Sequence, residues 1–522
     1  MLNSGRMPDI SHPGERAAAS GASRGRDAAE SAGRFDDYRR RIGLILGPTL
    51  FLLCYFWPGL DAPAAAQTLG GILALMIVFW VTEAVPLPVT ALLGPTLAVL
   101  LGVTSARGAF AAFADPIIFL FIGSFILAES MFVHGLARRM AYTAIASRWV
   151  GTSALRLGLA YSSVACVLSM WMSNTATTAM LFPLGLAVLA ELGRERGNDP
   201  AFRQYAIAIM LLTSFGASIG GMGTPVGTPP NLIGIGLLRD LAGIEISFTS
   251  WMLLAVPIVV IVMGALFVTL LYPRARRIAL NRDAVDVVRR HLHDLGGLTR
   301  GERNVIIAFG ITIVLWMVPG LLQAALGAGH PFVVRLNATV PEAIAALIGA
   351  LLLFVLPLGR GEQRYTMTWE QAARIDWGIV LLFGGGLAMG QLADSTGLSK
   401  GLGEWVAASY PGAGTVGLTL VFAGFAIVLS EAASNTAAAN IVVPMAIAVA
   451  QAAGVSPLEP ALAATLAASM GFMMPVSTPP NAIVYSSGYI PIGSMIRHGV
   501  VLDVIGYVVV VCAVLAGSAL LR

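Results

Sequence analysis

The sequence is poor in charge, lysine and cysteine. Only 11% of its 522 residues are Asp, Glu, Lys or Arg, less than half of the roughly 25% found in ordinary soluble domains. A single lysine, Lys400, is present. The three cysteines all lie inside apolar runs and offer neither a disulfide framework nor a metal signature. These shortages argue against a soluble domain, a disulfide scaffold and a cysteine-based metal site.

Apolar residues dominate instead. They make up 57% of the chain, and the mean hydropathy is +0.80. Successive apolar runs of about 17 to 23 residues are each long enough to cross a hydrocarbon core of roughly 30 Å as a helix. A transmembrane β-barrel would need alternating segments of ~10 residues, which the sequence does not show. We therefore predict an all-α polytopic membrane protein.

Residues 1–40 are rich in Gly, Ser, Pro, Arg and acids, and almost free of bulky apolar side chains. We expect a disordered cytoplasmic tail there, followed by a first transmembrane helix within 41–67. The acids weigh against a transit peptide, and no signal peptide is apparent. After the first helix, the predicted spans are 68–84, 87–104, 116–134, 205–238, 249–272, 303–323, 340–357, 376–392, 458–490 and 499–521.

Two further apolar segments, 154–191 and 415–452, are each interrupted by polar residues. We interpret both as re-entrant hairpins that return to the side they entered from. With the tail inside, this topology places all but five of the 32 basic residues on the inner side, as the positive-inside rule requires. The sequence pI of 9.1 is thus a topology signal, and nucleic acid is not an expected partner. The charged stretch 273–302 is predicted to be an amphipathic cytoplasmic linker.

An internal repeat divides the chain. SNT at Ser173 recurs at Ser434, and GL at Gly135 recurs at Gly397, with displacements of 261 and 262 residues. GTPPN from Gly227 is echoed by STPPN from Ser477. The predicted halves, 68–272 and 303–522, start on opposite sides of the membrane. Inverted repeats with interrupted helices in matching positions are typical of secondary transporters, whose sites lie near the bilayer midplane.

The interrupted segments have a distinctive chemistry. Backbone without helical hydrogen bonds is tolerated at membrane depth only against protein or a water-filled cavity. Free carbonyls beside Ser and Thr hydroxyls and an Asn oxygen form an uncharged hard-oxygen cage that suits Na⁺, whereas a helix N-terminus suits the oxygens of an anion. No Lys or Arg lies nearby, so bound cations and helix dipoles must balance the charge of the anion. Binding of the anion is then coupled to binding of the cations.

Other interpretations of these motifs fit the sequence less well. A lone SNT would usually be helix packing, but two SNT and two TPPN in matching order favour a binding site. A cation/proton antiporter would need buried acids at the breaks, and a membrane enzyme would need a His cluster, a Ser-Lys dyad or paired aspartates. Among acids in or near spans, Glu83 and Glu342 are expected to cap helices, and Glu431 is left open as a proton carrier or a structural anchor.

Five segments together resemble the divalent anion:sodium symporter (DASS) family, the INDY-type dicarboxylate transporters. They are TEAVPLPVTALLGP, SMWMSNTATTAM, GGMGTPVGTPPN, SNTAAAN and MMPVSTPPNAIVYSSGYI. The resemblance covers about 41–521 and implies eleven transmembrane helices plus two re-entrant hairpins. It also implies a homodimer in membrane lipid, with a scaffold domain and a transport domain that moves as an elevator.

The resemblance further implies at least two sodium sites with an anion between them. The first sodium site would use Ser169, Ser173, Asn174 and the carbonyl of Gly227; the second would use Ser430, Ser434, Asn435 and the carbonyl of Ser477. The substrate would contact Asn174, Thr175, Thr228 and Pro229 from one half and Asn435, Thr436, Thr478 and Pro479 from the other.

The function implied is secondary transport, without enzymatic activity. We expect sodium-coupled symport of C4-dicarboxylates (succinate, malate, fumarate). A sodium-independent anion exchanger, or a sodium-coupled transporter of citrate or sulfate, remains the alternative, because the family includes all of these. Thr228 occupies a position that is Ser in some dicarboxylate members, which leaves the substrate open. The expected location is a bacterial inner membrane, with the N-terminus cytoplasmic.

Overall fold

The computed structural model describes residues 37–57, 63–196, 199–278, 282–327, 329–359, 364–409, 412 and 414–518. Of the predicted disordered tail at 1–40, residues 1–36 lie outside this range, whereas 37–40 are helical, so the prediction is wrong for these four residues. Within the described range every regular element is a helix, apart from one isolated bridge between Pro357 and Tyr365. This confirms the predicted all-α class.

The first half begins with a helical stretch at 37–55. Asp115 and Ser247 show why helices start where they do, since their side chains accept hydrogen bonds from the first-turn N–H groups of α5 and α11. The helices that follow are α2 (Ala64–Thr82), α3 (Leu87–Leu100), α4 (Ala106–Phe110), η1 (Ala111–Ala114), α5 (Pro116–Val133), α6 (Leu136–Ile145), α7 (Ala154–Ser169), α8 (Asn174–Arg196), α9 (Pro200–Gly221), α10 (Pro229–Ala242), α11 (Phe248–Leu266), η2 (Phe267–Leu271) and α12 (Tyr272–Ala275).

The second half follows the linker helix α13 (Arg282–Asp294). Gly397 separates α18 from α19 at a φ of +82°, and Gly135 separates α5 from α6 at +73°, so the repeated GL pair marks the same kind of junction in both halves. The helices are α14 (Arg300–Leu326), α15 (Pro331–Thr339), α16 (Glu342–Val355), α17 (Trp369–Ala372), α18 (Trp377–Ser395), α19 (Leu398–Ser409), α20 (Thr415–Ala432), α21 (Asn435–Ala452), α22 (Leu458–Ala467), α23 (Pro479–Tyr485) and α24 (Ile492–Gly517).

Ten helices in the described residues are long and apolar enough to cross a membrane, or eleven if α15 and α16, which meet at 55°, form one bent span. The protein is therefore a multi-pass membrane protein. The most enclosed of these helices is α9, in which 94% of the residues of its apolar stretch are buried. Because α9 leads directly into the first GTPPN segment, the core of the molecule surrounds that break.

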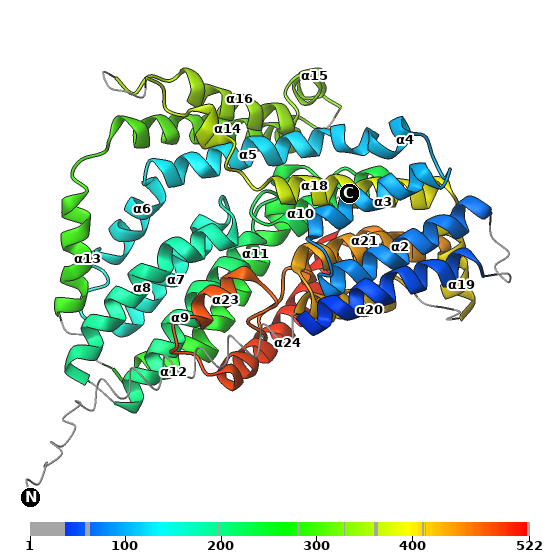
Figure 1. Ribbon diagram of the computed structural model, residues 1–522. Coiled ribbons are helices and arrows are strands. Elements are labelled where there is room, and N and C mark those ends of the chain that lie inside the picture. Colours follow the sequence, from blue (N-terminus) through cyan, green and yellow to red (C-terminus); the bar gives the residue numbers. More distant parts are fainter. Residues whose placement is uncertain are drawn as a thin grey trace, which may run out of the picture.

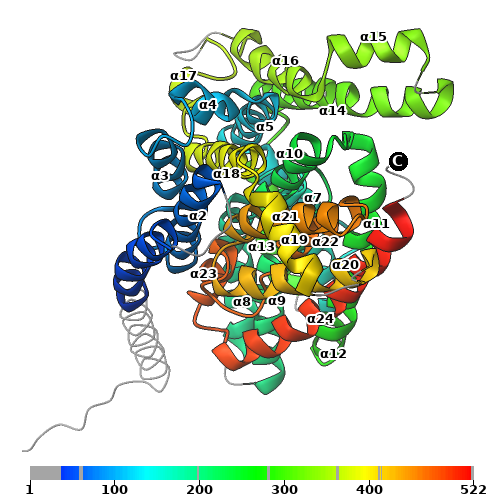
Figure 2. The same ribbon diagram turned by 90° about the vertical axis from the view of Figure 1, so that its right-hand side faces the viewer.

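The helices form two groups (Figures 1 and 2). In the first, α5, α14 and α16 pack together, and α15 lies beside them. The second contains the two hairpins, α7 with α8 and α20 with α21, together with α9, α10, α22 and α23. Between them α18 packs against both α3 and α10. The interrupted segments thus lie inside the second group.

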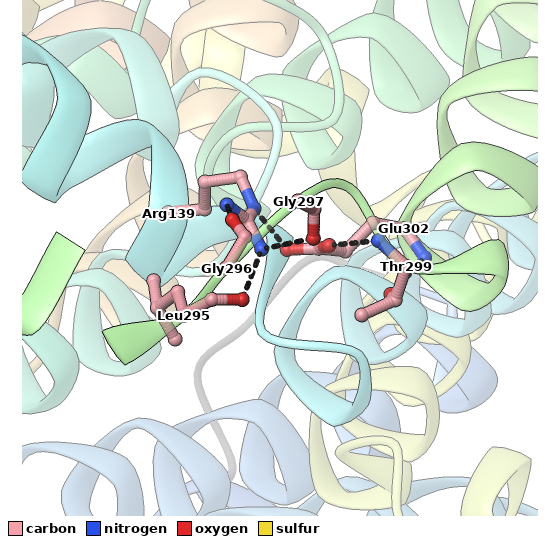
Figure 3. A network of polar contacts seen from close by, with 6 residues as sticks. All are labelled: Arg139, Leu295, Gly296, Gly297, Thr299 and Glu302. Carbon is pink, nitrogen blue, oxygen red and sulfur yellow. Dashed lines mark hydrogen bonds and ion pairs between the residues drawn. The ribbon is translucent and has the colours of Figure 1, made fainter. Parts of the chain in front are cut away.

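The linker is fastened to the first half by Arg139 of α6 (Figure 3). Its Nε atom is 2.5 Å from Oε1 of Glu302, and its Nη atoms donate to the carbonyls of Leu295, Gly296 and Gly297. Glu302 also completes a capping box with Thr299 at the start of α14. Charge-assisted hydrogen bonds of this kind are strong, so Arg139 holds the end of the linker and the start of α14 against α6.

Candidate functional site

The tip of the first hairpin lies between α7 and α8. Ser169 ends α7, and its Oγ atom donates to Oδ1 of Asn174, the first residue of α8, at 2.7 Å. Ser173 closes the turn by accepting a hydrogen bond from the N–H of Ala176 at 3.2 Å. The SNT motif therefore forms a compact cluster of uncharged oxygens at the start of a 23-residue helix.

The second hairpin repeats this contact. Ser430 donates to Oδ1 of Asn435 at 2.7 Å, the same distance as in the first hairpin, and also reaches the carbonyl of Ala468 at 2.8 Å. Asn435 begins α21, and Ser434 is its N-cap residue. The predicted pairing of each SNT with the serine one turn earlier is therefore present in both halves of the structure.

The two broken helices are held by their PPN asparagines. Asn231 donates from Nδ2 to the carbonyls of Gly221 at 2.9 Å and Thr224 at 2.7 Å. Asn481 does the same in the second half, reaching the carbonyls of Gly471 at 2.9 Å and Met474 at 3.0 Å. Both asparagines are fully buried. Each carboxamide thus clamps the non-helical loop of its own break.

The clamped loops lie against the hairpin tips. A Cβ atom added to Gly221 would be 2.3 Å from Oδ1 of Asn174, and one added to Gly227 would be 3.0 Å from the carbonyl oxygen of Ser169. Three of the four residues predicted for the first site, Ser169, Asn174 and Gly227, are therefore brought together around two glycines. Glycine is needed at both, because any side chain would occupy the space of these oxygens.

The second half shows the same convergence around Gly471. A Cβ atom there would be 3.0 Å from Oδ1 of Asn435, 3.2 Å from Oγ of Ser430 and 3.3 Å from Cβ of Ser477. Three of the four residues predicted for the second site thus surround one glycine. The oxygens are neutral and hard, which is the chemistry that suits an alkali cation rather than a soft metal.

The two halves meet crosswise. Helix α8, which follows the first SNT, packs against α23, which follows the second PPN; α21 packs against α10 in the same way. Ser214 of α9 donates a hydrogen bond to Oδ1 of Asn481, and the rings of Phe215 and Phe472 lie 5.0 Å apart. The helices that carry the four motifs therefore pack together in one region to which both halves contribute.

The residues predicted to contact substrate differ in exposure. Thr228 and Thr478 are buried, and the hydroxyl of Thr478 accepts a hydrogen bond from the N–H of Asn481 at 3.3 Å. Thr175 and Pro479 are exposed. The remaining four, Asn174, Pro229, Asn435 and Thr436, are half-buried. Six of the eight residues are thus at least partly exposed, whereas Thr228 and Thr478 are buried N-cap residues, of which Thr478 caps its helix through its side chain.

No basic side chain occurs in the segments 166–178, 220–231, 430–436 and 468–481. Among the described residues there is also no group of three or more His, Cys, Asp or Glu side chains that could hold a metal ion. A bound anion at this site would therefore be balanced by the N-termini of α8, α10 and α21 and by cations in the oxygen clusters. The N–H groups at a helix start are suitable donors to carboxylate oxygens.

Glu431 has the role of an anchor in this structure. Its Oε1 atom accepts from the N–H of Met473 at 2.7 Å, and Oε2 accepts from the N–H of Met474 at 3.2 Å and from Oγ of Ser477 at 2.5 Å. The carboxyl of Asp503 on α24 is its neighbour. Glu431 thus ties the second loop to α20, and its sequence position beside SNT serves that purpose.

The other predicted acids also act at helix ends. Glu83 is the C-cap residue of α2, at a φ of +48°, and pairs with Arg39 at 3.1 Å. Glu342 begins α16 and accepts a hydrogen bond from the N–H of Phe248 at the start of α11. A carboxylate at a helix N-terminus is stabilised by the helix dipole. The capping role is confirmed for Glu342, whereas Glu83 lies at a helix C-terminus and its carboxylate pairs with Arg39.

Sequence reasoning missed several residues that build the site. Gly221, Gly471, Asn231 and Asn481 were not among the predicted ligands, although they shape or clamp both loops. One signal could have identified them: each half has a glycine ten residues before its PPN asparagine. Ser214 carries no such signal, because the aligned position in the other half is an alanine.

The chain is similar to a known family and to known transporters over most of its length. The family model described as the sodium:sulfate symporter transmembrane region matches residues 42–521. A sodium-dependent dicarboxylate transporter, SdcS, of Staphylococcus aureus strain USA300 is 32% identical over 485 residues, which are 91% of this chain and 90% of that protein. SdcS of the bovine strain RF122 / ET3-1 is 33% identical over the same shares.

Two solved structures resemble the fold at low sequence identity. The YdaH transporter of Alcanivorax borkumensis superposes with a TM-score of 0.50 at 16% identity, covering 81% of this chain and 87% of that one. MtrF of Neisseria gonorrhoeae gives a TM-score of 0.53 at 15% identity, with coverages of 89% and 97%. At these identities the likeness concerns the fold alone.

Proposed function

The chain belongs to the sodium:sulfate symporter family, and from that premise we propose that it is a sodium-coupled symporter of C4-dicarboxylates such as succinate, malate or fumarate. Relatives named sodium-dependent dicarboxylate transporter support both the ion and the anion. Membership of a transporter family also agrees with the expectation that the protein is not an enzyme.

The observation that carries the proposal is the duplicated cluster of neutral oxygens. Ser169 with Asn174, and Ser430 with Asn435, make the same 2.7 Å contact beside the same kind of clamped loop. We propose that the first cluster, with Ser173 and the Gly227 carbonyl, holds one sodium ion. The second, with Ser434 and the Ser477 carbonyl, would hold another.

Coupling follows from the missing basic side chains. A dicarboxylate carries two negative charges, and the segments around the site supply helix dipoles but neither Lys nor Arg. Desolvating an anion without an opposite charge is costly. The anion would therefore bind well only after sodium has entered, and sodium would be retained better when the anion is bound.

We propose that the site moves as one body, as in an elevator. The crosswise packing of α8 with α23 and α21 with α10 supports this, since sliding one half alone would break it. Trp171, at the first hairpin tip, stacks on Trp316 of α14 with ring centroids 6.4 Å apart. This stack joins the moving body to the α5, α14 and α16 group, which would belong to the fixed scaffold of a homodimer.

The test is uptake of labelled succinate into proteoliposomes containing the purified protein, with sodium present or replaced by potassium or choline. The proposal predicts uptake that requires an inward sodium gradient and a sodium dependence steeper than first order, because two ions bind. Empty liposomes and protein-containing liposomes with a collapsed sodium gradient serve as controls.

Other results would identify the alternatives. Uptake that persists without sodium and depends on a dicarboxylate loaded inside would indicate an anion exchanger. Sodium-dependent uptake of citrate or sulfate, with none of succinate, would keep the coupling ion and change the substrate. Either outcome would overturn the corresponding part of the proposal.

A further inference from the structure

A second polar site lies at one end of the molecule, away from the hairpin tips. It is a pocket of about 670 Å³ where the start of α9, the end of the α11–α12 segment and the first turns of α24 come together. Its basic lining residues are Arg274, Arg277, Arg497 and His498. Nothing in the proposed transport mechanism uses this pocket.

The charge in the pocket is strongly positive. Arg277 and Arg497 are the charged neighbours of Arg274, and within the described residues no ion pair joins any of the three to an acid. The one acid in the lining is Asp199, whose Oδ1 atom already caps α9 by accepting from the N–H of Ala201. Three guanidinium groups thus face a single carboxylate.

The histidine does not add to this charge, and it orients Arg274. His498 Nδ1 lies 2.6 Å from the carbonyl of Ser494, which can only accept, so Nδ1 carries the hydrogen. His498 Nε2 is then free to accept from Nη2 of Arg274 at 2.7 Å. Nη1 of Arg274 donates to the carbonyl of Leu270 at 2.8 Å. Two of the guanidinium nitrogens are therefore fixed by the protein.

The third guanidinium nitrogen is not satisfied. Nε of Arg274 is buried and has no hydrogen-bond partner among the described residues. Buried donors are rarely left without a partner in native proteins. The exposed guanidinium groups of Arg277 and Arg497 beside Arg274 offer donors to an acceptor-rich anion, and a phosphate group matches their charge and their forked donor geometry.

The surroundings favour a phosphate that carries acyl chains. Val501 lines the pocket one turn after Arg497, and Val504 and Val508 continue the same face of α24 with exposed fractions of 58% and 52%. On the adjacent α11 segment, Ile261 and Val268 are also exposed, at 54% and 69%. Helices α11 and α24 pack together, so an apolar surface for acyl chains leads directly away from the basic pocket.

We propose that this pocket binds the phosphate headgroup of an anionic phospholipid. The leaflet is the one on the side of the 273–302 linker, which the charge distribution predicts to be cytoplasmic, where anionic lipids attract basic residues. The linker region thus has a specific partner in addition to its role in orienting the two halves.

The test compares a double variant, Arg277→Gln with Arg497→Gln, with a matched control, Arg276→Gln with Arg290→Gln. The tested pair lines the pocket, and neither side chain makes a hydrogen bond within the described residues. The control removes the same charge nearby: Arg276 lies over the Tyr272 ring at 5.7 Å, and Arg290 is an exposed residue of α13. Neither control residue lines the pocket.

The full-length protein is delipidated in detergent and titrated with dioleoyl phosphatidylglycerol, dioleoyl phosphatidylcholine or inorganic phosphate while thermal unfolding is followed. Phosphatidylglycerol should stabilise the wild type and the control saturably. In the double variant the half-saturating concentration should rise roughly 25-fold, about fivefold for each arginine. Phosphatidylcholine and inorganic phosphate should have little effect.

Three results would overturn the proposal. Equal stabilisation by phosphatidylcholine would show that the headgroup charge is not recognised. Equal loss in the control would show a nonspecific surface effect. Saturation by inorganic phosphate at a similar concentration would identify a soluble anion as the ligand. None of these readouts depends on transport, so they are independent of the proposed function.

Discussion

Replacing Asn481 with alanine tests how the second loop is held. In the wild type its carboxamide binds the carbonyls of Gly471 and Met474 and accepts from Ser214. The Met474 carbonyl keeps a second donor, the N–H of Ser477 at 3.3 Å. Loss of its hydrogen bond to Asn481 should therefore cost only about 1 kcal/mol of stability. The Gly471 carbonyl has no other donor among the described residues and would be left buried, at a cost of about 1–3 kcal/mol.

The expected destabilisation of the ordered loop is therefore about 3 kcal/mol, or roughly a hundredfold in its population. If sodium binds only the ordered loop, the sodium concentration that gives half-maximal uptake should rise by up to that factor. The assay is sodium-dependent succinate uptake, paired with thermal unfolding in detergent. Both measurements should move in the same direction.

Asn440→Ala is the matched control. It makes the same substitution at a buried site on α21, where Nδ2 donates to the Thr436 carbonyl one turn earlier at 3.0 Å. That carbonyl lies within a helix and keeps its backbone partner, so the cost should be about 1 kcal/mol and the sodium dependence should not change. If Asn481→Ala retains wild-type sodium dependence and thermal stability, the clamp does not hold the loop and the reasoning is wrong.

Three further outcomes are expected. Asn174→Ala and Asn435→Ala should each abolish uptake while leaving a monodisperse, folded protein by size-exclusion chromatography; normal uptake by either would show that the site is misplaced. Gly221→Ala should sharply weaken sodium-dependent uptake, since its Cβ would be 2.3 Å from Oδ1 of Asn174, and an unchanged sodium dependence would contradict this contact. Arg139→Met should destabilise the protein by about 3–5 kcal/mol in thermal or denaturant unfolding, because the Glu302 side chain, only 2% exposed, would lose its partner; Glu302→Gln should cost less.

The helical class and the position of both breaks could be predicted because hydrophobicity and proline act locally. The SNT and PPN residues interrupt apolar runs at points where no continuous helix is possible, and α8, α10, α21 and α23 begin there. The short helices α6 and α19 are not predicted as separate elements, because each follows a membrane span after a short junction with a single glycine, and α13 lies in the stretch 273–302, which is predicted only as an amphipathic linker.

The contacts between the halves could not be predicted. The Ser214–Asn481 hydrogen bond joins residues 267 positions apart, and no periodicity records which helices will be neighbours. The basic pocket could not be predicted for the same reason. Arg274 and Arg497 are separated by more than 200 residues, so the distribution of charge indicates only that both lie on the predicted inner side. Local chemistry was visible in the sequence, whereas long-range convergence required the fold.

The crosswise packing of the halves has a consequence for how the chain is made. The break after α9 is synthesised about 250 residues before α23, which carries the Asn481 that accepts from Ser214 of α9, and at ~5–20 residues per second this leaves a wait of roughly 12–50 s. During that time its carbonyls would be unsatisfied in lipid. Asn231 removes this hazard, because it lies ten residues after Gly221 in the same segment and closes the loop without help from later residues. The first half can therefore enter the membrane as a finished hairpin and loop, and then wait for its counterpart.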